Sequence, residues 1–192
     1  MVSLAWPEEF SIKISSFLSI AMILLVSASA AVASGETASI TAEDALEKLL
    51  DGNGRFASGN SSHPDQSFER RAELLAGQHP FAVIVGCSDS RIAPEVLFDQ
   101  GLGDIFVIRT AGQVLDNASL GSIEYVVEHL GVPLVMVLGH DSCGAVSATV
   151  QGGEVSGHLE SLVQFNQPAD DAAREAGNES QVLDSSIDNN VW

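Results

Sequence analysis

Two cysteines and one histidine stand where they could bind a metal ion together. Cys87 follows the apolar run 81–86, and His140 and Cys143 follow the apolar run 134–139. Thiolate and imidazole are ligands that zinc prefers, and a site with three protein ligands leaves a fourth position open, as catalytic zinc sites do. We therefore predict one zinc ion per subunit, bound by Cys87, His140 and Cys143.

An aspartate and an arginine follow the first cysteine at short spacing. Asp89 lies two residues after Cys87, close enough to accept a hydrogen bond from water at the metal or to bind the metal itself as a fourth ligand. Arg91 can hold that carboxylate through a charge-assisted, bidentate pair. We interpret Asp89 and Arg91 as a catalytic pair, although an Asp-x-Arg spacing alone is more typical of a surface ion pair.

The same cysteines admit other interpretations. Two cysteines in one chain are often inert core residues, and Cys87 and Cys143 could form a disulfide or act as a thiol–disulfide pair. Either alternative leaves His140, Asp89 and Arg91 without a role. The coincidence of all five residues at predicted strand ends favours the metal site.

Three short apolar runs are the elements that must position these side chains. The runs 81–86, 105–108 and 134–139 are apolar throughout, as strands covered on both faces are. A helical pattern over 119–130 separates the second run from the third. This alternation predicts an α/β fold with a mainly parallel central β-sheet flanked by helices, and with the zinc site at the C-terminal ends of the strands.

Further helices are predicted outside this central region. Thr41 resembles an N-cap, and we expect the helix that follows it to end at Gly52 and Gly54. Shorter helices are expected over 68–76 and 158–163. Residues 167–192 are acidic and polar, and we expect no further buried strand from them.

Composition and the N-terminal sequence limit the kinds of protein that this chain can be. The chain has 192 residues and a formal net charge of −18, and so acidic a surface argues against nucleic-acid binding. The uncharged run 14–33 ends in Ala31-Val32-Ala33, which is typical of a secretory signal. We expect residues 1–33 to be a signal peptide, or alternatively a membrane anchor, and residues 34–192 to form one domain. The protein is then exported to the periplasm or the medium.

The segments Cys87-Ser88-Asp89-Ser90-Arg91 and Gly139-His140-Asp141-Ser142-Cys143-Gly144 together resemble the two zinc-binding signatures of the β-class carbonic anhydrases. The resemblance extends over about residues 55–148, including the segments 103–109 and 121–125. It implies a zinc enzyme that hydrates CO2 reversibly to bicarbonate and a proton.

The resemblance also implies residues of a substrate pocket. Gln78, nine residues before Cys87, corresponds to the pocket glutamine of the family, and Phe106 and Tyr125 correspond to its aromatic pocket residues. Without the resemblance, an exposed loop residue and two core aromatics would be the simpler interpretation. The family builds the pocket across a subunit interface, which implies a homodimer or a higher even oligomer.

Departures from the family pattern leave alternatives open. Ile84 stands where members with an inhibitory bicarbonate pocket carry tryptophan, and Gln113 stands where many carry asparagine. Members normally continue past Asn190-Val191 with a helix and a further strand, which suggests a C-terminally truncated domain. The alternatives are therefore a related zinc hydrolase of CS2 or COS, and a non-catalytic zinc-binding domain.

Overall fold

The computed structural model describes residues 40–176 and 182–191 of the chain. The predicted signal peptide or anchor at 1–33 lies outside the described residues. Among the residues that are described, no helix combines the length and the apolar character that a bilayer span requires.

A parallel three-stranded sheet forms the centre of the fold, in the order β2-β1-β3. The strands are β1 (Ala82–Cys87), β2 (Ile105–Thr110) and β3 (Val135–Leu138). The middle strand β1 is buried along its whole length, which is why its sequence is apolar at every position. The predicted α/β class with a parallel sheet is confirmed.

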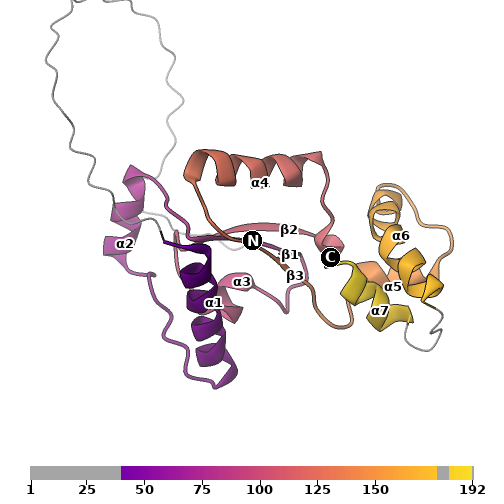
Figure 1. Cartoon of the computed structure of the whole chain (residues 1–192), viewed down its shortest axis with the longest axis horizontal. Helices are drawn as coiled ribbons and strands as arrows, with labels where there is room; N and C mark the ends of the chain where they lie inside the picture. Colours follow the sequence, from indigo (N-terminus) through magenta and orange to yellow (C-terminus); the bar gives the residue numbers. More distant parts are fainter. Residues whose placement is uncertain (1–39, 177–181, 192) are drawn as a thin grey trace, which may run out of the picture. The chain divides into compact units, whose positions relative to one another are not determined.

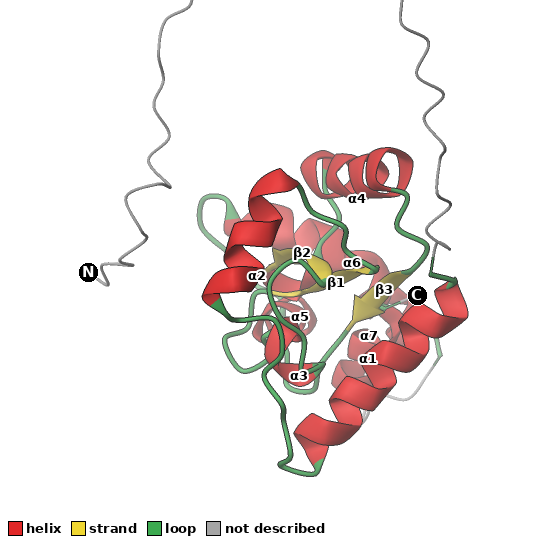
Figure 2. Cartoon of the chain, turned by 90° about the vertical axis from the view of Figure 1, so that its left-hand side faces the viewer, coloured by secondary structure: helices red, strands yellow, loops and turns green. Residues whose placement is uncertain are grey.

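Helices cover both faces of the sheet. Helix α4 (Asn117–Leu130) lies on one face, and α1 (Ala42–Ala57) and α3 (Pro94–Leu97) lie on the other (Figures 1 and 2). Side chains of β1 alternate between these layers, because Ala82 and Ile84 pack with α1 whereas Val83 and Val85 pack with α4.

The ends of these helices follow from local capping. The Thr41 hydroxyl accepts a hydrogen bond of 3.1 Å from the Asp44 N–H at the start of α1. The Asp116 carboxylate accepts one of 2.8 Å from the Ser119 N–H at the start of α4, and Gly131, with φ 67°, ends that helix in the left-handed conformation. Helix α2 (Phe68–Glu73) and the 3₁₀ turn η2 (Leu74–Ala76) occupy the predicted segment 68–76.

The predicted end of the first helix is wrong. Helix α1 continues through Gly52 and Gly54 and ends at Ala57. A Cβ at position 52 would lie 1.7 Å from the Phe98 carbonyl oxygen. Gly52 therefore allows the helix to approach the α3 segment closely, and does not mark its end.

Three helices gather at the carboxyl ends of the strands (Figure 1). They are α5 (Gly144–Gln151), α6 (Leu159–Glu175) and α7 (Val182–Asn189). Helix α6 is much longer than the predicted 158–163 and includes Pro168. The polar C-terminal region supplies no strand among its described residues, as expected, but α6 and α7 both bury side chains.

Candidate metal centre

The sheet register brings the three predicted ligands to one place. Cys87 is the last residue of β1, and Gly86 pairs with Leu138, two residues before His140. Cys143 is the N-cap of α5. The ligand atoms of Cys87, His140 and Cys143 all lie within 4.8 Å of one another, and the two Sγ atoms are 3.9 Å apart.

The protonation of His140 suits metal binding. Its Nδ1 lies 2.9 Å from the Asp141 carbonyl oxygen, and because a carbonyl can only accept, Nδ1 carries the proton. The buried Nε2 is left with a lone pair, and it has no hydrogen-bond partner among the described residues. An imidazole nitrogen with a free lone pair beside two buried thiols is a donor set that suits zinc.

The two thiols lie in unlike environments. Burial acts to raise the pKa of the Cys87 thiol, but its polar surroundings, first among them hydrogen bonds from the backbone N–H groups of Gly112 and Asp89, outweigh burial, and this pKa lies below its ordinary value. The pKa of Cys143 is raised, by burial and by the adjacent charge of Cys87. A bound dication would relieve this repulsion, because both sulfurs bind metals as thiolates.

Asp89 and Arg91 form a bidentate pair beside the cluster. The Arg91 guanidinium donates from Nε to Oδ1 at 2.9 Å and from Nη2 to Oδ2 at 2.7 Å. Its hydrogen bonds hold the pKa of the Asp89 carboxyl far below the usual range. Asp89 Oδ2 also lies 3.9 Å from His140 Nε2, so the carboxylate borders the position that a metal ion would occupy.

Arg109 has a role that the sequence did not reveal. From the end of β2 it donates to the carbonyl oxygens of Cys87, at 2.8 Å, and of Asp89, at 2.6 Å. These hydrogen bonds hold in place the backbone that carries Cys87 and Asp89. An arginine directly after the apolar run 105–108 was the available signal, but the hydrogen-bond partners of Arg109 are backbone atoms, which no spacing in the sequence indicates.

The predicted pocket residues do not join this cluster within one chain. Gln78 is exposed and precedes β1, and Phe106 pairs with Val83 near the amino ends of the strands. Tyr125 lies on α4 with 48% of its surface exposed, and its ring contacts His129 at 5.4 Å between centroids. Cys87 lies at the opposite end of β1 from Gln78.

An apolar cavity of about 260 Å³ lies between α5 and α6. Two of its lining residues are chain neighbours of cluster residues, since Ala111 precedes Gly112, whose N–H bonds Cys87, and Gly144 follows Cys143. The cavity is lined by Ala111, Gly144, Ala145, Ala148, Val155, Leu159, Leu162 and Val163. It offers room for a small apolar molecule.

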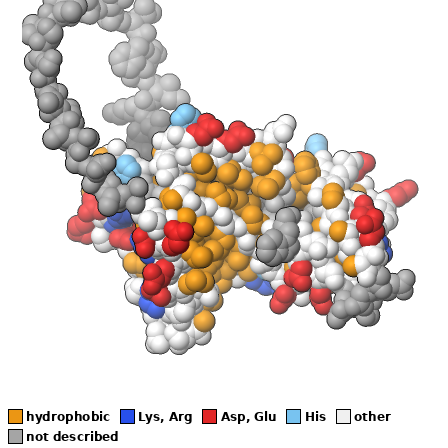
Figure 3. Space-filling view, viewed as in Figure 1, with side chains coloured by type: hydrophobic (Ala, Val, Ile, Leu, Met, Phe, Trp, Pro, Cys, Tyr) orange, Lys and Arg blue, Asp and Glu red, His pale blue; other side chains and the backbone are white. Residues whose placement is uncertain are grey.

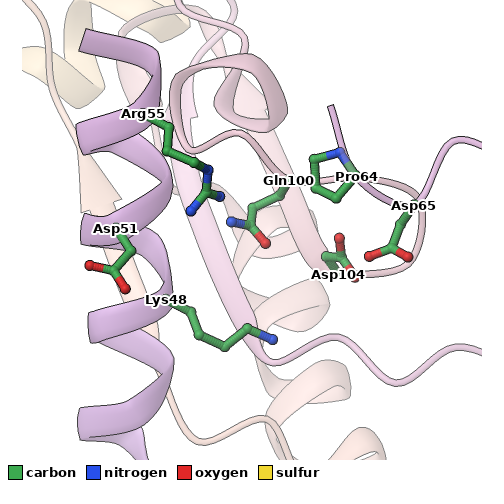
Figure 4. A pocket seen from close by; sticks show the side chains of 7 residues that line it. All are labelled: Lys48, Asp51, Arg55, Pro64, Asp65, Gln100 and Asp104. Atoms are coloured by element: carbon green, nitrogen blue, oxygen red, sulfur yellow. The ribbon is translucent and has the colours of Figure 1, made fainter. Parts of the chain in front are cut away.

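A second cavity, of about 240 Å³, is lined by charges of both signs (Figure 4). It lies near the amino ends of the strands and is lined by Lys48, Asp51, Arg55, Pro64, Asp65, Gln100 and Asp104. Arg55 donates to Asp99 at 2.6 Å, and Arg70 pairs with Asp104 at 3.3 Å. Because these charges compensate one another away from the cluster, we assign this cavity no part in the chemistry.

Known carbonic anhydrases are similar to this chain over most of its length. The carbonic anhydrase family profile matches residues 82–192. A carbonic anhydrase of Mycolicibacterium smegmatis is 57% identical over 137 residues, which cover 69% of this chain and 66% of that protein. Carbonic anhydrase 2 of Mycobacterium tuberculosis is 54% identical over 129 residues, 65% of this chain and 62% of the relative. The chain thus spans just under two thirds of these relatives.

Solved structures of the same kind share the fold. One of two tetrameric β-carbonic anhydrases of Sordaria macrospora matches with a TM-score of 0.57 and 25% identity, over 75% of this chain and 76% of that one. The Coccomyxa β-carbonic anhydrase in complex with acetazolamide matches with a TM-score of 0.57 and 27% identity, over 76% of this chain and 67% of that one.

Proposed function

This chain belongs to the β-class carbonic anhydrase family, and on that premise we propose that it hydrates CO2 reversibly to bicarbonate and a proton, using one zinc ion. One observation carries the proposal: Cys87, His140 and Cys143 present three converging donor atoms, and Asp89, held by Arg91, borders them. Three donors leave a fourth position for chemistry, and the carboxylate stands next to it.

Zinc bound there would supply hydroxide near neutral pH, because coordination lowers the pKa of water. The protein's own residues would do the rest. Asp89 accepts a hydrogen bond from the attacking water and so orients a lone pair of that water toward the carbon of CO2. The apolar wall at Ala111 and Gly144 suits CO2, which has no charge to pair. A new C–O bond forms, one C=O bond opens to carry the negative charge, and the proton of water passes to solvent.

The experiment measures zinc content and CO2 hydration on the purified full chain and on Cys143→Ser. We expect one zinc per chain and rapid hydration in the wild type, and loss of both in the variant. Stoichiometric zinc in Cys143→Ser would overturn the ligand assignment. If the protein turned over CS2 or COS but not CO2, the proposed substrate would be wrong. If it bound zinc but turned over none of these substrates, the zinc site would be structural.

We further propose that the working form is a homodimer or a higher even oligomer. Gln78 and Phe106 lie at the end of the sheet away from the cluster, so a pocket that combines them with Asp89 needs a second copy. Hydrophobic side chains also gather on the surface between α4 and α1, on the side where β3 is the edge strand of the described sheet (Figure 3). An exposed patch of this kind favours association.

Mixing two inactive variants tests this assembly. Cys143→Ser removes a metal ligand, and Gln78→Ala removes the pocket amide from an exposed loop. Random pairing makes half of the dimers hybrids, and each hybrid has one intact pocket if metal and amide come from different subunits. We expect recovery of about one quarter of the wild-type sites. No recovery, or a fully active monomer in light scattering, would contradict a shared pocket.

We propose export as well, supported by the uncharged run before Ala33. N-terminal sequencing of the mature protein is expected to begin near Ser34. An intact N-terminus at Met1 in a membrane fraction would indicate an anchor instead, and the same N-terminus in the cytosol would refute export.

A further inference from the structure

Gly112 is held from several sides next to the metal centre. It has φ 71°, in the left-handed region, and its N–H donates to Cys87 Sγ at 3.2 Å. Its carbonyl oxygen accepts from Asn190 Nδ2 at 2.9 Å. A Cβ on Gly112 would lie 3.0 Å from the Asn166 side-chain amide and 3.0 Å from Ala145 Cβ. Contacts with α5, α6 and the residue after α7 therefore hold Gly112 in the conformation in which its N–H points to the sulfur.

The two asparagines form a continuous, uncharged network. Asn166, with 1% of its surface exposed, donates to the Leu162 carbonyl at 2.7 Å and accepts from Asn190 Nδ2 at 2.8 Å. A buried amide is costly unless its polar atoms are bonded. Since Asn190 completes the bonds of Asn166 and also holds Gly112, the loss of Asn190 would release both.

The same C-terminal segment contacts the surroundings of the other two ligands. Ile187 of α7 packs in one buried cluster with Cys87, Cys143 and Val146. Val191 lies so close to Gly139 that a Cβ there would be 2.5 Å from its methyl group, and Gly139 directly precedes His140. Residues 187–191 therefore contact the backbone or side chains next to all three predicted ligands.

We propose that Asn190, supported by Asn166, is a positioning residue of the metal centre, which holds Gly112 so that its N–H donates to Cys87 Sγ and thereby strengthens zinc binding. The inference rests on the proposed zinc enzyme. A donor on the thiolate fixes its orientation and stabilises its charge. Losing such an outer partner typically weakens metal affinity or activity by about 10- to 100-fold.

Zinc affinity, measured by competition with a chelator, tests the inference. Asn190→Ala removes the donor, and Asn190→Asp keeps the shape of the side chain but cannot donate. Asn189→Ala is the matched control, because Asn189 is adjacent, has the same chemistry and donates only to the Ala169 carbonyl of α6 among the described residues, at 3.3 Å. We expect zinc to dissociate about tenfold more readily from both Asn190 variants, and within about twofold of wild type from Asn189→Ala.

Two further measurements separate this role from general stability. The cobalt-loaded Asn190 variants should show a shifted thiolate-to-metal absorption band, whereas Asn189→Ala should not. In the zinc-loaded wild type, the Gly112 amide should be protected from hydrogen exchange. A freely exchanging Gly112 amide overturns the proposal even if Asn190→Ala fails to fold.

The outcomes also distinguish the two levels of the proposal. A wild-type protein that binds no zinc refutes the proposed function. A wild type that binds zinc and hydrates CO2, together with Asn190 variants of unchanged zinc affinity, refutes the positioning role alone.

Discussion

Replacing Arg91 by alanine should convert Asp89 from a catalytic group into an inhibitor. Arg91 makes three hydrogen bonds to the Asp89 carboxylate, and only two of them use the guanidinium. The third, from the Arg91 backbone N–H to Oδ1 at 2.9 Å, survives in Arg91→Ala. The substitution therefore keeps Oδ1 tethered and releases Oδ2.

The released oxygen has a short way to move. Asp89 Oδ2 lies 3.9 Å from His140 Nε2, whereas two ligands of a tetrahedral zinc, each about 2.0–2.1 Å from the metal, are about 3.3 Å apart. A shift of roughly 0.6 Å, the difference between these separations, brings the carboxylate to ligand distance. Because a catalytic group misplaced by about 1 Å can cost about 100-fold in rate, and because the carboxylate would also take the fourth position from water, we expect a loss of roughly that order, with zinc retained.

The pH dependence identifies the cause of this loss. In the wild type, Arg91 holds the pKa of Asp89 far below its usual range, so the carboxylate is ionised throughout neutral pH. In Arg91→Ala that pKa returns toward about 3.9, which is still well below neutrality, so protonation cannot explain lost activity there. Hydroxide competes better with the carboxylate as the pH rises. The deficit of the variant should therefore shrink between about pH 6.5 and 9.

The assay pairs elemental zinc analysis with stopped-flow CO2 hydration over this pH range. Asp89→Ala should also keep zinc, since three ligands remain, and should lose rate without the pH-dependent recovery. Arg71→Ala is the control, because the Arg71 guanidinium lies over the Phe68 ring at 4.0 Å on α2, away from the cluster. A zinc-loaded Arg91→Ala protein with the wild-type rate would refute the reasoning.

Three other outcomes are expected. Removing zinc leaves the Sγ atoms of Cys87 and Cys143 3.9 Å apart, so diamide should oxidise both thiols to a disulfide in the apo protein and not in the zinc-loaded one, as thiol titration would report. Leu49→Ala, at a fully buried position, should lower the free energy of unfolding by about 2–5 kcal/mol without loss of zinc, which urea titration and metal analysis check together. Hydrogen bonds from the Ser62 backbone and from Arg55 hold the pKa of the Asp99 carboxyl far below its usual range. Asp99 therefore contributes stability above about pH 4, and this stability is lost as the pH falls through the lowered pKa. Asp99→Asn should lower the urea midpoint at pH 7, and equal midpoints for variant and wild type would contradict this role.

The sheet and the ligand cluster could be predicted from sequence because both depend on signals that are local in the chain. A parallel strand buried on both faces must be apolar throughout, so β1 was visible as a run. The chemistry begins where such runs end, so Cys87, the last residue of β1, and His140, two residues after β3, were visible as the first metal-binding side chains after the apolar runs. The prediction assumed only that β1 and β3 are parallel neighbours, and the sheet shows that they are.

The errors arose where tertiary contacts decide the local structure. Gly52 has the residue type of a helix end, but the Phe98 carbonyl against it explains the glycine. Helix α6 was underestimated because its buried positions include Asn166 and Asp170 beside Ala169 and Ala173. Small and polar residues at helical spacing give no hydrophobic periodicity, so a buried face of this kind cannot be recognised from sequence.

The metal centre therefore combines parts of two kinds. Its donors lie beside strand ends and are readable one by one, whereas the hydrogen bonds that orient them join residues far apart in the chain. Asn190 reaches Gly112 across 78 residues, and Arg109 reaches Cys87 across 22. If Asn190 and Asn166 position the centre as proposed, a substitution at either residue impairs zinc binding while every ligand remains in place. An intact set of ligands is then evidence for the chemistry only together with the contacts that hold it.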